Sequence, residues 1–203
     1  MIKTYRATFS LVNKKAMKKY LFIISSLLLI NSSMLSAQAV KLDKYELQPV
    51  QVLLSGEKLM SKATVRVVKD SAVTGANEST FARLKDVSFS NGTIEIKLLS
   101  RLLKNAGESA RGFIGVAFRI DSSNSKYECI YLRPTNGRAD DQVRRNHSVQ
   151  YVSAPEYKFD RLRKESPEKY ESYADMGLNE WITVKIEVKG EKAKLFLNGS
   201  KQP

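Results

Sequence analysis

The chain contains a single cysteine, Cys129, and a single histidine, His147, among its 203 residues. One cysteine excludes an internal disulfide, and one cysteine with one histidine excludes the Cys/His ligand sets that hold structural zinc. Cys129 belongs to the strand-like run YECIYL, so we expect a small, buried or half-buried residue rather than a nucleophile. Disulfide, zinc and thiol chemistry are therefore not expected in this protein.

The sequence also lacks an apolar run long enough to cross a bilayer. Its longest run, YLFIISSLLLI at 20–30, is about half of the roughly 20 apolar residues that a membrane-spanning helix needs. Lysines precede this run, and a small-residue A-x-A stretch ends at Ala39. This order is typical of a secretory signal peptide, and a membrane anchor is the alternative. We therefore expect removal of residues 1–39 and an exported domain at 40–203, periplasmic or extracellular, without a stable membrane anchor.

The positive charge of the chain is concentrated in the expected signal peptide. The formal net charge is +13, and residues 1–39 hold six basic residues and no acid, so subtracting six leaves +7 for residues 40–203. The remaining basic residues are scattered among 21 acids rather than placed along one helix. Nucleic acid, which needs a concentrated basic footprint, is therefore not an expected partner.

Short segments with alternating apolar and polar residues fill most of the chain after residue 40. Val87 and Phe89, then Asn91-Gly92, then Ile94, Ile96 and Leu98 predict a hairpin with a two-residue turn. One region is helical in character: around 156–173 we expect two short helical turns, one of them opened by Ser166-Pro167. Seven further runs predict strands, at 50–54, 64–68, 112–120, 127–133, 148–152, 181–188 and 192–197.

Many short strands with one helical excursion predict an all-β sandwich of antiparallel sheets rather than a barrel or an α/β fold. Alternation assigns one set of apolar side chains to its core. The set is Ile114, Val116, Phe118, Ile130, Leu132, Ile182, Val184, Ile186 and Val188.

The opposite faces of three strands carry polar and aromatic side chains around small residues. Gly115 and Ala117 predict a shallow floor. The residues expected to stand around it are Arg119, Tyr131, Arg133 and Gln150. Such a face offers the directed hydrogen bonds that sugar hydroxyls need and an aromatic face for the C–H side of a sugar ring. An ordinary solvated sheet face is the alternative, because Tyr and Arg on an exposed face are common.

A dense polar segment joins two of these strands, between Tyr131 and Val152. Its candidate ligand-binding residues are Asn136, Arg144, Arg145 and His147. Asp140 and Asp141 precede the two arginines by four to five residues, so we expect ion pairs that fix the crossing.

Five segments resemble the concanavalin A-like lectin/glucanase superfamily, and within it the exported bacterial laminin G-like and 3-keto-disaccharide hydrolase-like domains. They are GFIGVAFR, YECIYLRP, RRNHSVQYVSAPEYKFDRLR, EWITVKIEV and KLFLNG. The resemblance covers about residues 80–200 and is most specific between Tyr131 and Leu162. It implies a jelly-roll sandwich of two curved antiparallel sheets, with a ligand on the concave sheet.

Two departures from that superfamily bear on function. The E-x-D-x-x-E run of its family 16 hydrolases is absent, so no strand supplies the paired carboxyls of a retaining glycosidase. Related domains also continue after the KLFLNG segment, whereas here Asn198-Gly199 is followed by only a few residues, so we expect either that the second strand of this hairpin is absent or that the domain at 40–203 is a C-terminally truncated part of a longer protein. A missing partner strand would leave an unpaired sheet edge.

Three functions remain open at this point. The first is a carbohydrate-binding, lectin-like domain. The second is a glycoside hydrolase-like enzyme with Asp140, Asp141 or Glu128 as acid or base, assisted by His147. The third is a structural interaction module without a small ligand. We expect no cofactor: related sandwiches sometimes hold calcium with loop carboxylates, and the neighbouring acids Asp140 and Asp141 are only a weak signal for it.

The charge, apolar run and A-x-A order predict a mature chain that starts at Val40. Intact-mass analysis of protein recovered outside the cytoplasm should give the mass of residues 40–203. A mature chain that still contains residues 20–30 would show an anchor instead.

Overall fold

The structure is a computed structural model that describes residues 46–75 and 77–203. The expected signal peptide at 1–39 lies outside these described residues. Within them, none of the helices combines the length and the apolar character that crossing a bilayer requires.

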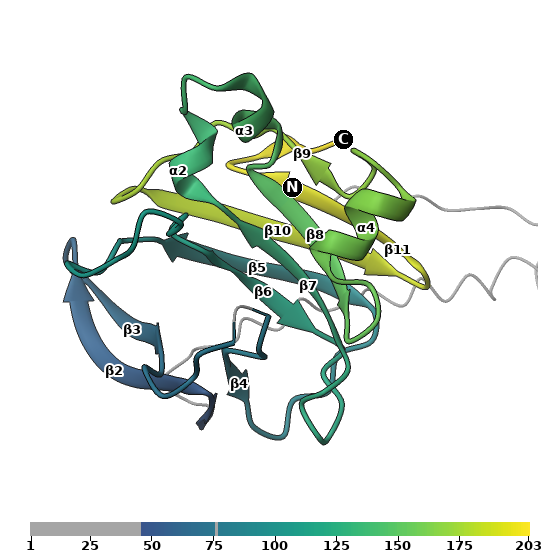
Figure 1. Cartoon of the computed structure of the whole chain (residues 1–203). Coiled ribbons are helices and arrows are strands. Elements are labelled where there is room, and N and C mark those ends of the chain that lie inside the picture. Colours follow the sequence, from purple (N-terminus) through teal and green to yellow (C-terminus); the bar gives the residue numbers. More distant parts are fainter. Residues whose placement is uncertain (1–45, 76) are drawn as a thin grey trace, which may run out of the picture. The chain divides into compact units, whose positions relative to one another are not determined.

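The described chain is mostly β, with antiparallel pairing throughout (Figure 1). Two sheets have four strands each. The β6 sheet has the order β6 (Ile114–Phe118), β7 (Tyr127–Leu132), β8 (Val149–Ala154), β9 (Glu171–Ser172). The β10 sheet has the order β12 (Ser200–Lys201), β11 (Lys192–Leu197), β10 (Trp181–Lys189), β5 (Gly92–Leu99). The all-β expectation is confirmed.

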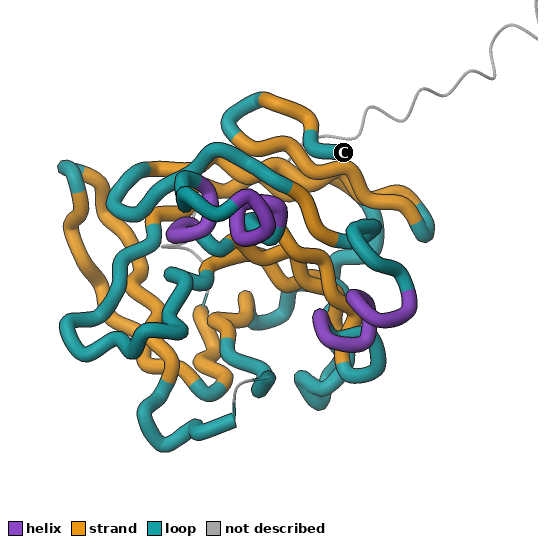
Figure 2. Tube along the Cα trace, turned by 45° about the horizontal axis from the view of Figure 1, so that its top comes forward, coloured by secondary structure: helices purple, strands orange, loops and turns teal. Residues whose placement is uncertain are grey.

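Two smaller sheets accompany them. β1 (Leu47–Val50) pairs with β4 (Phe81–Leu84), and β2 (Val52–Leu59) pairs with β3 (Lys62–Lys69). Figure 2 shows the β2–β3 hairpin to one side of the larger sheets. The described helices are α2 (Pro134–Gly137), α3 (Gln142–Asn146) and α4 (Phe159–Glu165). In the same view, α2 and α3 lie close together, and α4 lies apart from them against β8.

The core is a cluster of apolar side chains contributed by both large sheets. Seven of the nine predicted core residues belong to its buried part, and Ile114 and Val116 pack against it while partly buried. The fully buried members of β10 alternate with more exposed ones along the strand, as period-two geometry requires. All seven predicted strands have an observed counterpart, so the core prediction is confirmed.

The predicted hairpin at Asn91-Gly92 is wrong. The segment from Val87 to Ser90 forms no strand, and β5 pairs with β10, about ninety residues further along the chain. Gly92 does have a positive φ of 132°, but the side-chain oxygen of Asn91 accepts a hydrogen bond from the amide of Gly190 at 2.7 Å. The alternating segment Gly92–Leu99 therefore pairs with a strand distant in sequence. Asn91 forms no hairpin turn and instead holds the neighbouring β10–β11 turn through its bond to Gly190.

The other Asn-Gly pair does form a tight hairpin. Asn198 and Gly199 have φ values of 49° and 85°, and they connect β11 to the short strand β12 with Leu197 opposite Ser200. Positive φ at both central residues is the conformation that two-residue hairpins prefer, and it explains this sequence. A short partner strand thus covers part of the edge of β11.

The helical excursion is partly as predicted. α4 lies within the expected 156–173 range, but Ser166 ends it rather than opening a second helix, and Pro167 follows that end. The polar crossing contains two short helices that the sequence did not reveal, α2 and α3. Pro134 starts α2, and Asp141 caps α3 by accepting the amide hydrogen of Arg144 at 2.9 Å.

Phe118→Ala tests the core. Phe118 is buried, and its ring meets that of Phe89 edge to face at 6.3 Å. Removing it should lower the free energy of unfolding by about 3–5 kcal/mol in urea titrations, since a cavity adds to the lost transfer energy. A near-neutral result would contradict this core.

Candidate functional site

The outward face of the β6 sheet carries a row of four residues, one from each strand. Gly115 lies opposite Tyr131, Tyr131 opposite Gln150, and Gln150 opposite Glu171. These side chains share the face that points away from the core, because Ile130, Leu132 and Val149 occupy the other one. A continuous transverse line of small, aromatic, amide and acidic groups therefore crosses the sheet.

Arg133 is the centre of the hydrogen bonds on this face. Its guanidinium donates to the carbonyl of His147 at 2.8 Å, to Glu171 Oε1 at 3.2 Å, to the Tyr131 hydroxyl at 3.0 Å and to Gln150 Oε1 at 3.2 Å. The Arg133 side chain is only 7% exposed. A buried guanidinium needs such a full set of acceptors, because each unpaired donor would cost free energy.

Glu171 is the counter-charge of this centre, and its side chain is 4% exposed. Arg163 of α4 donates to both carboxylate oxygens, at 2.7 and 2.5 Å. His147 Nδ1 lies 3.0 Å from Glu171 Oε1, although the ring N–H is not aligned for a hydrogen bond. Burial acts to raise the pKa of Glu171, but the Arg163 hydrogen bonds and the surrounding positive charges outweigh it and lower that pKa. Glu171 is therefore held as an anion.

Two aromatic rings lie beside Arg133. The ring centroids of Phe113 and Tyr131 are 5.9 Å apart, and the guanidinium carbon of Arg133 is 6.0 Å from the first and 5.0 Å from the second. Tyr131 is partly buried, which raises the pKa of its hydroxyl. Phe113, by contrast, is 58% exposed. One supported ring thus presents a free face to solvent.

α4 covers the other half of this sheet face. Its Leu162 is buried, as are Val152 and Ala154 of β8. Cys129, which pairs with Val152, lies on the same covered half, and burial raises the pKa of its thiol to about 12. Cys129 is half-buried, as expected. The open half of the face is the part that carries Phe113, Gly115 and Tyr131.

Gly115 is required by the packing of β6 on β7. A Cβ at this position would lie 2.6 Å from the Cα of Tyr131 and would also clash with the carbonyl oxygen of Ile130. Ala117, the other predicted floor residue, is partly buried. Gly115 is exposed beside Tyr131, and close strand approach requires a glycine there.

The crossing from β7 to β8 is held by bonds to the backbone and to amides rather than by the predicted ion pairs. Arg145 donates to the carbonyls of Ala139 and Asp140, at 2.5 and 3.0 Å. Arg144 donates to Asn136 Oδ1 at 3.0 Å. Asp141 is occupied by its helix cap. The predicted Asp–Arg ion pairs are therefore wrong. Both arginine side chains donate to other groups of the crossing, and the Asp141 side chain accepts the backbone amide hydrogen of Arg144 instead.

Asn136 connects the crossing to the buried centre. It is 3% exposed, and its amide donates to the carbonyl of His147 at 3.2 Å, the same oxygen that Arg133 uses. Next to it, Gly137 packs against the backbone of Met176 so closely that a Cβ would clash with its amide nitrogen at 2.8 Å. The crossing is thus anchored to the segment that leads into β10.

The structure brings together most of the predicted site residues but not all of them. Tyr131, Arg133, Asn136, Arg144, His147 and Gln150 form one connected set, and Arg145 braces the loop around it. Arg133 and Gln150 are buried, so they support the face rather than reach out from it.

Arg119 lies elsewhere. It has a positive φ of 53° just after β6 ends, and its guanidinium pairs with Glu128 at 2.7 Å and donates to the carbonyls of Ser90 and Gly190. Its predicted place beside Gly115 and Ala117 is wrong, because strand alternation ends with β6 at Phe118. The positive φ of Arg119 turns its side chain away from that face. Arg119 instead links the β6 sheet to the segments flanking β5 and β10.

Three residues of this site were not predicted. Glu171 and Arg163 lie in the helical excursion, where no alternation marks which side chain faces the sheet. Phe113 did carry a signal, since it occupies the same face as Gly115 by period two.

Comparisons with known proteins add no assignment: no family model, no curated protein and no solved structure matches this chain.

Replacing Glu171 tests the buried centre. Glu171→Gln keeps the shape but leaves Arg133 and Arg163 without an anion, so we expect a loss of about 3–5 kcal/mol in the free energy of unfolding. Because the pKa of Glu171 is lowered by folding, its contribution is complete above the ordinary value of 4.5 and is lost as pH falls through the lower native value. The variant should therefore depend less on pH below 4.5 than the parent.

Glu165→Gln is the matched control. Glu165 pairs with Arg161 on the exposed side of α4 at 2.8 Å, and such pairs contribute about 1 kcal/mol or less. If both variants unfold alike in urea at neutral pH, the Glu171 centre is not what holds β9 and α4 on the sheet.

Proposed function

We propose that this protein is an exported carbohydrate-binding, lectin-like domain that holds a glycan on the open half of the β6 sheet. We further propose that its fold is the concanavalin A-like jelly roll, with the β6 and β10 sheets as the two layers of the sandwich. The sequence resemblance described above and the shared apolar core of the two sheets support this fold. It places the binding face on the outside of a sheet rather than in a deep cavity.

The observation that carries the proposal is the supported aromatic ring of Phe113. It is 58% exposed, it leans on Tyr131, and the exposed residue Gly115 follows in the next outward position of β6. A sugar stacks the C–H side of its ring on an aromatic face and needs bare backbone or small residues around it. A ring fixed by its neighbours also loses little entropy on binding.

Two side chains that lie against Glu171, which itself accepts a hydrogen bond from Arg133, add polar groups to the site. Arg163 and His147 are partly exposed; Glu171 accepts hydrogen bonds from Arg163, and His147 Nδ1 lies 3.0 Å from Glu171 Oε1. Each retains donors that Glu171 does not use, and these are suited to hydroxyl oxygens. Arg133 stays buried and acts by positioning: it supports both aromatic rings and fixes the backbone of His147. Recognition on this view is by one stacked ring and a few directed hydrogen bonds.

Hydrolysis has less support than binding. Glu171 is held as an anion between arginines, which disfavours a role as general acid. Glu128 is engaged by Arg119 and by the Tyr151 hydroxyl on the opposite side of β7, and Asp141 caps α3. On the face of Glu171, the register gives β6, β7 and β8 no second Asp or Glu, so these strands supply no partner carboxyl of the kind that glycosidases use.

A glycan array probed with the purified protein, with and without calcium, identifies the ligand, and Phe113→Ala then tests the site. We expect the variant to lose binding at least about tenfold, as aromatic anchors do. Its free energy of unfolding should change by about 1 kcal/mol or less, because the ring is mostly exposed. Binding that does not respond to a chelator would agree with the expected absence of a cofactor.

Leu53→Ala is the control, since Leu53 is an equally exposed apolar residue (59%) on β2. It should bind the glycan like the parent. If no glycan binds the parent on the array, the lectin proposal is wrong and the face is that of a structural interaction module.

A further inference from the structure

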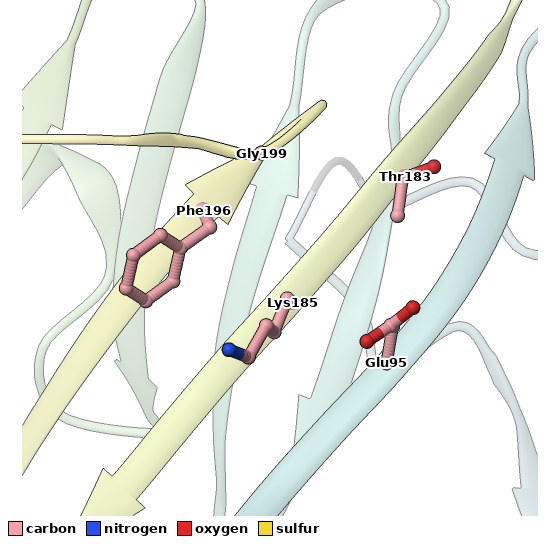
Figure 3. A pocket seen from close by; sticks show the side chains of 5 residues that line it. All are labelled: Glu95, Thr183, Lys185, Phe196 and Gly199. Carbon is pink, nitrogen blue, oxygen red and sulfur yellow. The ribbon is translucent and has the colours of Figure 1, made fainter.

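The outward face of the β10 sheet is a second, chemically different surface. Figure 3 shows Glu95, Lys185, Thr183 and Phe196 on three neighbouring strands of this sheet, with Gly199 at the nearby turn. They line an open hollow of about 280 Å³. Glu95 lies opposite Lys185, and Lys185 lies opposite Phe196, so the hollow follows one transverse row of the sheet.

Lysines dominate this face. The pairing register and the alternation of burial place six lysines on it against two glutamates, Glu95 and Glu187. The lysines are Lys97, Lys185, Lys189, Lys192, Lys194 and Lys201. All of them are at least partly exposed.

Two of these lysines are placed at a cost to the fold. Lys189 and Lys192 lie directly opposite each other beside the β10–β11 turn. Like charges at directly opposed positions destabilise an antiparallel pair. Only Lys185 has an ion pair that uses a glutamate of this face, with Glu187 at 2.7 Å. The remaining positive charge is available to an anionic partner.

The centre of the face is an aromatic ring between two lysines. Lys185 lies over the Phe196 ring, with its ammonium nitrogen 4.9 Å from the centroid, and Lys201 pairs with Phe196 from the other side. Thr183 and Glu95 add a hydroxyl and a carboxylate at the rim of the hollow. The hollow therefore combines cations, an apolar surface and hydrogen-bond acceptors within a few strand spacings of about 4.8 Å.

We propose that this face binds an acidic polysaccharide, with the lysines pairing its anionic groups and the hollow taking one sugar ring. A polysaccharide of this kind carries hydroxyls as well as anions. Its hydroxyls donate to Glu95 and Thr183, and its ring stacks on Phe196. The lysine array supplies a binding energy that depends on salt, because bound cations of the polymer are released.

Two other polyanions fit this face less well. Nucleic acid is recognised through arginine forks and successive stacked bases, whereas this face has lysines and, at the hollow, the one ring of Phe196 with Lys185 over it. An anionic membrane attracts unbroken basic patches, and Glu95 and Glu187 interrupt this one. A carboxylate at the hollow is useful only to a ligand that also offers hydrogen-bond donors.

Dextran sulfate is the probe, with neutral dextran of the same length as its control. We expect the protein to bind dextran sulfate and not dextran. Lys97→Gln with Lys194→Gln and Lys201→Gln should weaken binding about tenfold or more at low salt and reduce the salt slope by about two units. Lys126→Gln with Lys164→Gln, exposed lysines of a turn and of α4, should change neither quantity by a comparable amount.

Two further variants separate a sugar site from simple charge attraction. Glu95→Ala removes a negative charge, so it strengthens purely electrostatic binding, but it weakens binding several-fold if Glu95 accepts sugar hydroxyls. Phe113→Ala, on the other sheet, should leave dextran sulfate binding unchanged. Tighter binding by Glu95→Ala would overturn the proposal. So would tighter binding of an oligothymidylate or of phosphatidylglycerol vesicles at matched charge concentration, or an unaffected lysine triple variant that melts like the parent.

Discussion

One buried carboxylate organises the β6 sheet and everything laid over it. Glu171 comes from a strand of two residues that has little pairing of its own, yet it receives hydrogen bonds from Arg133 of the neighbouring crossing and from Arg163 of α4. The helix, the short strand and the crossing are therefore held to the sheet by the same anion. Removing a charge of this kind leaves two guanidinium groups without compensation in a site that water scarcely enters. The geometry of the open face depends on that anion being present.

Some residues of this site are buried and hold it in place, and others remain exposed to solvent. Arg133, Gln150 and Asn136 are buried and use their hydrogen-bonding groups within the protein, so they fix positions. Phe113 and Arg163 remain available to a partner. The polar density along the sequence therefore marked a connected hydrogen-bonded cluster, several of whose members are buried. Arg133, with the most hydrogen bonds, is buried and supports the face, whereas the exposed side chain is that of Phe113, which cannot form such bonds.

The two large sheets share a core and differ in their outer faces. The β6 sheet carries a supported ring and directed polar groups around Gly115, and α4 covers its other half. Between Trp181 and Pro203 the described chain contains strands and no helix. The β10 sheet presents lysines around Phe196. Packed and hydrogen-bonded side chains thus shape the outer face of the β6 sheet, and the outer face of the β10 sheet is marked by its positive charge. The two proposed ligands, a neutral sugar and an acidic polysaccharide, would therefore occupy separate faces of one domain.

The sequence by itself determined the all-β class, the longer strands and the core, because period-two alternation records directly which side chains are buried. It also located the polar crossing and the half-buried position of Cys129. The tertiary structure alone decided the pairing partners: β5 joined β10 rather than forming the local hairpin that Asn91-Gly92 predicted, since pairing depends on burial across ninety residues. It decided as well that Arg119 leaves the face and that Glu171 enters it. Those outcomes rest on a φ angle after a strand end and on a two-residue strand, and neither has a periodic signature for a sequence to display.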